Sequence, residues 1–211
     1  MRLLRPAPLG AALILTWLCF SGCDLPPLSG AGPAPQEVMA RSGDVPSDLR
    51  RCPSSGPIDG YLEALKAKNP VAYRSLQGGW ADLKGKGAKT GGIAVFTAVS
   101  AGCQAPLGAS PGRNLANLVA VFNDEKAAAS AYRSGIFGFP TPASDEQLPG
   151  LSKGLATGLS DNAWVVQRVV GGRALYVGWW QDQAVVSFLV SADLDSTESV
   201  RASGAVERRI R

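Results

Sequence analysis

The side chains that most often carry enzyme chemistry are scarce in this chain of 211 residues. It contains no histidine, which excludes every mechanism built on an imidazole base and every His-ligated zinc site. Carboxylates remain, and Asp145, Glu146 and Asp161 could pair for acid-base work, but no spacing singles out a pair among the 17 acidic residues. We therefore predict no catalytic residues, no metal site and no cofactor.

Residues 84–92 (KGKGAKTGG) combine glycine and lysine in a way that invites comparison with a phosphate-binding loop. In the motif G-x-x-x-x-G-K-[ST], Lys89 would be the lysine, but Ala88 and Leu83 occupy the positions of both required glycines. Two interpretations remain for this segment. It is a solvated lysine-rich turn, or it contacts anionic lipid head groups or envelope polymers.

Four aromatic residues are the candidates for a binding surface. Phe137 and Phe139 lie in a segment (IFGFP) whose glycine and proline disfavour regular structure, whereas Tyr176 and Trp180 lie on the mixed face of a predicted strand. If no helix covers that face, Tyr176 and Trp180 form a surface for stacking or for a partner. Packing in the core is the alternative for all four residues.

The hydrophobic pattern predicts an α+β domain over residues 51–211. Its clearest part is a three-stranded meander in which Gly171-Gly172 forms the first turn and residues 181–183 the second. The element order is helices, two strands, helix, meander, helix, which predicts a mainly antiparallel sheet with helices on one face. The predicted strands are residues 93–99, 118–122, 164–170, 173–180 and 184–190.

Proline, glycine and capping residues mark the predicted helix ends. A first helix follows Pro57 and ends at Asn69-Pro70, where a second helix begins and is interrupted at Gly78-Gly79. A third helix covers residues 124–134, with Asn123 as its cap. The last helix starts at a capping box of Asp195 and Glu198. It ends in charges that suit a helix C-terminus better than a ligand site: Arg208, Arg209 and Arg211.

The N-terminus has the features of an export signal. Arg2 and Arg5 precede an apolar run over residues 9–20, which is too short to span a bilayer as a permanent helix. The segment that follows, Phe20-Ser21-Gly22-Cys23, resembles the lipobox of bacterial lipoproteins, although Phe20 stands where that family usually has leucine. The resemblance covers residues 1–23 and implies cleavage before Cys23 and acylation of Cys23. An ordinary cleaved signal peptide and an uncleaved anchor are the alternatives.

Export would change the fate of the four cysteines. Cys19 is lost with the signal peptide and Cys23 is acylated, so Cys52 and Cys103 remain and are predicted to form one disulfide in an oxidising compartment. A redox-active dithiol is the alternative, but the pair lacks the C-x-x-C spacing. Between Cys23 and the domain, residues 24–50 are rich in proline and glycine and are predicted to be a flexible linker.

Together these features predict a lipoprotein on the extracytoplasmic side of a cell membrane, with a non-catalytic binding or accessory domain. Removal of residues 1–22, which hold two arginines and no acid, lowers the net charge from +4 to +2, so nucleic acid is not an expected partner. The expected partners are the membrane, through the lipid anchor, and an envelope protein or a small apolar ligand. Two alternatives stay open: an envelope hydrolase that uses Asp or Glu, and a carrier of an apolar ligand.

Overall fold

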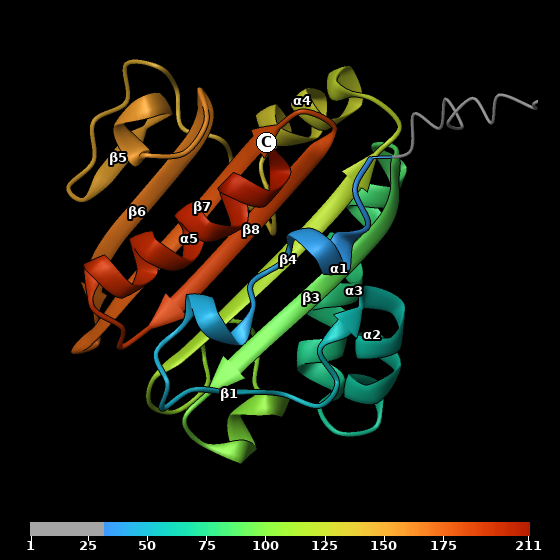
Figure 1. Ribbon diagram of the computed structural model, residues 1–211, viewed down its shortest axis with the longest axis vertical. Helices are drawn as coiled ribbons and strands as arrows, with labels where there is room; N and C mark the ends of the chain where they lie inside the picture. The colour runs from blue at the N-terminus through green and yellow to red at the C-terminus, as the bar shows by residue number, and fades with distance from the viewer. Residues whose placement is uncertain (1–31) are drawn as a thin grey trace, which may run out of the picture.

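An eight-stranded antiparallel sheet forms the middle layer of the computed structural model, which describes residues 32–211 (Figure 1). The strand order is β1-β3-β4-β8-β7-β6-β5, and β2 also pairs with β3. This confirms the predicted α+β fold with an antiparallel sheet. The strands are β1 (Arg50–Arg51), β2 (Gly56–Pro57), β3 (Ala88–Thr97), β4 (Asn114–Phe122), β5 (Leu151–Lys153), β6 (Asn162–Val170), β7 (Arg173–Asp182) and β8 (Val185–Ala192).

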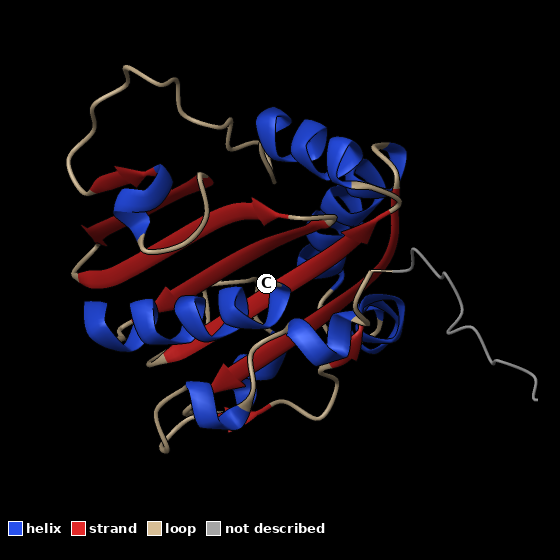
Figure 2. Ribbon diagram, turned by 45° about the horizontal axis from the view of Figure 1, so that its top comes forward, coloured by secondary structure: helices blue, strands red, loops and turns tan. Residues whose placement is uncertain are grey.

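Helices cover both faces of this sheet, so the prediction that they lie on one face is wrong (Figure 2). Helices α2 (Ile58–Lys66), α3 (Pro70–Gly85) and α4 (Glu125–Ser134) pack on the first face. Helices α1 (Pro35–Val38) and α5 (Ser196–Ile210) pack on the second face. The reason lies in the central strands: every residue of β4 is buried, as in strands that are covered on both sides. Three short 3₁₀ helices complete the set: η1 (Ser42–Asp44), η2 (Ser100–Gln104) and η3 (Gly154–Thr157).

Most of the predicted helix and turn signals are present. The Asn69 side chain accepts a hydrogen bond from the Ala72 amide at the start of α3, and Asp195 and Glu198 form the capping box of α5. Gly171 and Gly172 both have positive φ and form the two-residue turn between β6 and β7. The cap of α4 is Asp124, one residue later than predicted.

Helix α3 does not stop at Gly78-Gly79 but continues to Gly85. Trp80 and Leu83, just beyond the two glycines, are almost fully buried against the sheet. This burial outweighs the cost of two glycines inside a helix, which is about 1 kcal/mol each. Tertiary packing therefore overrides the local signal.

Residues 33–49, here called the strap, are part of the folded domain, so the predicted linker is wrong over these residues and the domain starts before the predicted residue 51. Val38, Met39, Val45 and Leu49 are buried in the core beneath α5. The strap is also held by polar contacts with the sheet and α5. These are Asn117 Oδ1 with the Ala40 amide at 2.9 Å, and Arg209 with the Val38 and Met39 carbonyls and with Asp44. The signal peptide, Cys23 and residues 24–31 lie outside the described residues.

Candidate binding surface

Trp180 and Tyr176 do not form a surface, because α5 covers their face of the sheet. Trp180 is 0% exposed and Tyr176 is 3% exposed, and both belong to the core that contains Ala202 and Val206 of α5. The Tyr176 hydroxyl lies 2.8 Å from the Ser203 hydroxyl. Burial raises the pKa of Tyr176 to about 12. The predicted faces of the meander are correct, but both faces are core.

Phe137 and Phe139 lie in a tight turn that follows α4. The backbones of Ile136 and Phe139 pair through reciprocal hydrogen bonds, and the two residues between them, Phe137 and Gly138, have φ values of 49° and 78°. A positive φ at a residue with a bulky side chain is unfavourable, so packing must compensate. The Phe137 ring supplies it by an edge contact with Phe188 of β8, with ring centroids 5.4 Å apart.

Around this turn is an apolar hollow of about 210 Å³, here called the aromatic groove. Helix α3 forms one side, the loop after η2 forms another, and Phe188 belongs to β8 of the sheet beneath. Phe139 remains 57% exposed. The lining residues are Ala72, Ser75, Leu76, Pro106, Leu107, Phe137, Phe139 and Phe188. Small-molecule sites usually enclose about 300–1,000 Å³, so this groove suits a single apolar side chain or ring better than a cofactor.

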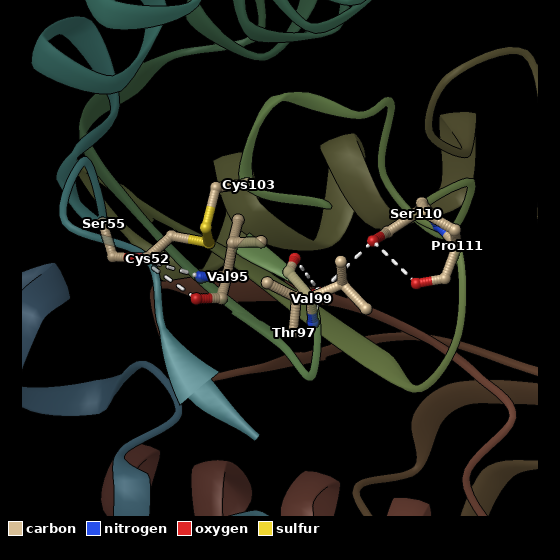
Figure 3. The surroundings of a disulfide bond; sticks show 8 residues. All are labelled: Cys52, Ser55, Val95, Thr97, Val99, Cys103, Ser110 and Pro111. Atoms are coloured by element: carbon tan, nitrogen blue, oxygen red, sulfur yellow. Dashed lines mark hydrogen bonds between the residues drawn. A yellow bond between two sulfur atoms is a disulfide. The ribbon is translucent and has the colours of Figure 1, made fainter. Parts of the chain in front are cut away.

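The predicted disulfide between Cys52 and Cys103 is present, with Cα atoms 5.5 Å apart. It joins the segment beside β3 to η2 (Figure 3). Cys103 is four residues before Leu107, which lines the aromatic groove. The Cys52 side is fixed to β3, because the Cys52 amide donates to the Val95 carbonyl and the Ser55 hydroxyl accepts from the Val95 amide. The disulfide thereby ties the groove's loop to the sheet.

A second set of bonds holds the far end of the same loop. The Thr97 hydroxyl lies 3.3 Å from the Ser110 hydroxyl (Figure 3). The side-chain Nδ2 of Asn114 donates to the carbonyls of Ser110 and Gly112. Gly102 lies against this contact, since a Cβ there would come within 1.9 Å of the Ser110 hydroxyl oxygen. The loop between Cys103 and Asn114 is therefore fixed at both ends.

Of the three carboxylates considered as an acid-base pair, Asp145 and Asp161 are exposed, and Glu146 is half-buried, where it accepts from the Ala143 amide. The acid that the sequence analysis missed is Glu207 of α5, which is 2% exposed. Burial raises the pKa of Glu207, the neighbouring Asp182 raises it further, and Arg211 opposes both. Glu207 is followed by Arg208, Arg209 and Arg211, so the local sequence predicts an exposed, charged helix end. No sequence signal indicates that Glu207 is buried.

Neither Glu207 nor Asp182 lines the aromatic groove, and the groove lining contains no acidic or basic residue. Within residues 32–211, no three His, Cys, Asp or Glu side chains are grouped so that they could hold a metal ion. The aromatic groove can therefore exclude water from an apolar group and contact it, with Ser75 as a hydroxyl at its edge. It offers no general acid or base.

The lysine-rich segment contains a turn at Lys86 and Gly87, between α3 and β3, and Lys84 and Lys89 on either side of it are exposed. Lys84 and its neighbours end α3, and Lys89 lies on β3. Lys84 is placed over the Trp80 ring at 5.8 Å, and Lys86 pairs with Asp82. Lys89 also lines a cavity of about 780 Å³ together with Gly32 and Asp59.

Comparisons with known proteins add little. No protein-family model and no curated protein matches the chain. Among solved structures, the extracellular domain of PknH from Mycobacterium tuberculosis is similar with a TM-score of 0.44 and 8% sequence identity, over 85% of this chain and 97% of that chain. This likeness is too low to support an argument about function. None of the helices in residues 32–211 has the length and hydrophobicity needed to cross a membrane.

Proposed function

We propose that this chain is a bacterial lipoprotein, held by acylated Cys23 on the extracytoplasmic side of a membrane, whose domain binds an apolar group of an envelope partner without catalysing a reaction. The lipobox resemblance of residues 20–23 supports the anchor. The Cys52–Cys103 disulfide supports the compartment, because disulfides persist where the environment is oxidising.

The observation that carries the binding function is the exposed ring of Phe139 at the aromatic groove. An apolar side chain that enters the groove would contact Phe139 and Leu107 and remove both from water. Burial of one large apolar side chain is worth about 2 kcal/mol. A hydrolase would need two carboxylates in a groove, and the aromatic groove has none. A carrier of an apolar ligand would need a large cavity behind the sheet, whereas both faces of the sheet are packed by helices and the strap. The cavity of about 780 Å³ lies at the end of the sheet, beside Gly32 and Phe122, and not behind it.

The anchor is tested by Cys23→Ala in the full-length protein, expressed in a bacterium with lipoprotein processing. We expect the variant to keep its signal peptide or to leave the membrane fraction. A mature-sized variant that still sediments with membranes would rule out acylation at Cys23.

The binding surface is tested by placing a photo-crosslinking amino acid at residue 139 and, as the matched control, at residue 155. Leu155 is 70% exposed and lies on η3, outside the aromatic groove. We expect one envelope partner to be crosslinked from residue 139 and not from residue 155, and to be lost when Leu107→Ser is added. Equal capture from both positions would show that the groove is not the binding surface.

A further inference from the structure

The strap fixes where the anchor meets the domain. The expected linker ran to Arg50, which would have allowed the domain to stand well clear of the lipid. The strap instead packs under α5, with Val38 at 0% exposure and Arg209 bonded to Asp44, so the connection to Cys23 is only residues 24–31. From Cys23 to Gly32 such a chain spans at most about 30 Å, whatever conformation it takes.

Gly32 lies at one particular end of the sheet. It shares a cavity with Lys89 at the start of β3 and with Phe122 at the end of β4, and Ala88 and Phe122 are paired in the sheet. The turn between β7 and β8 lies at the same end, because the Phe122 amide donates to the Ala184 carbonyl. We call this the Gly32 end.

The β6–β7 hairpin lies at the opposite end of the sheet. Asn114, at the other end of β4, pairs with Ala192, and Ala192 pairs with Leu175 of β7. From that point β7 and β6 extend further to the Gly171-Gly172 turn. At about 3.3 Å per residue the hairpin tip is about 40 Å from the Gly32 end. Figure 1 shows the start of the described chain and this hairpin at opposite ends of the sheet.

The Gly32 end also carries the lysine-rich segment. Its basic residues are Lys84, Lys86, Lys89 and Lys126. Lys126 belongs to this end because the next residue, Ala127, lies against Gly87. Its acidic residues are Asp59, Asp82, Asp124, Glu125 and, just before the β7–β8 turn, Asp182. Four of these acids already have partners: Asp59 accepts from the Trp80 indole, Asp82 pairs with Lys86, Asp124 caps α4, and Asp182 pairs with Arg211. Within the described residues, Lys84, Lys89 and Lys126 form no ion pair.

From this arrangement we infer that the Gly32 end rests on the head-group layer of the membrane, while the β6–β7 hairpin points away from it. The inference rests on the proposed acylation of Cys23. Because positive and negative side chains balance at this end, the short connection, rather than a charge excess, sets the orientation. Lys84, Lys89 and Lys126 then lie within the roughly 10 Å over which surface charges act on anionic head groups.

Lipid-attached quenchers can test the orientation. The acylated full-length protein, with its disulfide intact, would carry a thiol-reactive fluorophore at Lys89→Cys or, as the control, at Val170→Cys, which is 54% exposed on the hairpin. The variants would be placed in vesicles of phosphatidylethanolamine and phosphatidylglycerol that include a head-group nitroxide lipid. We expect quenching at residue 89 and none at residue 170. Equal quenching, or quenching at residue 170 alone, would overturn the orientation.

Two controls separate this inference from the proposed anchor. Flotation of the vesicles is measured first: protein that does not float with lipid refutes acylation, whereas protein that floats without quenching at residue 89 refutes only the orientation. In a variant with about twenty Gly and Ser residues inserted after Gly30, the domain is free to turn, so we expect the difference between residues 89 and 170 to disappear. A difference that persists would show that the short connection does not cause the orientation.

Discussion

The ring of Phe137 lies so close to Gly79 of α3 that a Cβ on residue 79 would come within 1.9 Å of its Cε1 atom. Gly79 therefore makes room for the ring that anchors the turn of the aromatic groove. Gly78, the neighbouring residue, has open space where its Cβ would be. The two glycines that suggested a helix break thus have different roles, and only Gly79 is required by packing.

This difference predicts opposite effects of two alanine substitutions. Gly78→Ala should stabilise the protein by about 0.5–1 kcal/mol, because it replaces glycine in a helix without a clash. Gly79→Ala should destabilise it by about 1–3 kcal/mol, because the Phe137 ring must move. Urea unfolding followed by circular dichroism measures both. A stabilising Gly79→Ala would show that the ring moves aside at no cost.

The disulfide predicts a second effect. Replacing Cys52 and Cys103 together by serine should lower the free energy of unfolding by about 4 kcal/mol on the chain-entropy model, since the cysteines are 51 residues apart. The loop that contains Pro106 and Leu107 should then lose protection. Amide hydrogen exchange of residues 103–113, compared with α5 as the internal reference, measures this loss. Unchanged exchange in the loop would mean that the Thr97 and Ser110 contact holds it alone.

Local signals in the sequence predicted the helix caps, the Gly171-Gly172 turn and the sheet faces, because each depends on residues that are close in the chain. The Cys52–Cys103 pair could be predicted because, under the proposed export and acylation, these are the two of the four cysteines that remain free to pair. The position of α5 could not be predicted in this way. Whether a helix covers the face of Trp180 depends on the path of the chain through space, and without that path an aromatic residue on a mixed face reads as exposed.

The strap was missed for a related reason. Its apolar residues, Val38, Met39, Val45 and Leu49, are separated by proline, glycine and charge, so the segment has the composition of a linker. Its burial comes from partners far along the chain, such as Asn117 and Arg209. One part of the aromatic groove could be predicted, because the IFGFP segment indicated an irregular turn. Leu107 and Phe188 lie far from this segment in the sequence, and only the fold brings them to it.

The ion pair between Asp44 of the strap and Arg209 of α5 predicts a pH-dependent loss of stability. Burial by itself would raise the pKa of Asp44, but hydrogen bonds from Arg209 and the Arg41 amide and the charge of Arg209 outweigh it and lower the pKa below 3.8. A lowered pKa stabilises the folded state at pH values above the unfolded-state pKa. This stability is lost as the pH falls through the folded-state pKa. Asp44→Asn should therefore cost about 1–3 kcal/mol at pH 7.

The measurement is urea unfolding of wild type and Asp44→Asn from pH 7 down to pH 2. We expect the two curves to converge once the pH falls below the lowered pKa of folded Asp44, where Asp44 itself is protonated. Asp48→Asn is the matched control, because its ion pair with Arg113 is at an exposed site. A similar loss in both variants would show that the strap gains nothing special from Asp44.

Glu207 predicts the opposite dependence on pH. Burial and Asp182 raise its pKa, and one carboxylate oxygen, Oε2, has no hydrogen-bond partner among the described residues. The folded state therefore binds the proton more tightly than the unfolded state, so stability is present below the unfolded-state pKa and is lost as the pH rises through the folded-state pKa.

In Glu207→Gln the side-chain carbonyl still accepts from Arg211, and the amide donates towards Asp182. We expect the variant to be about 1 kcal/mol more stable than wild type at pH 8. The difference should vanish near pH 4, where Glu207 is protonated in both states. If the variant is less stable at pH 8, the charge of Glu207 is needed by Arg211, and the ion pair outweighs the cost of burial.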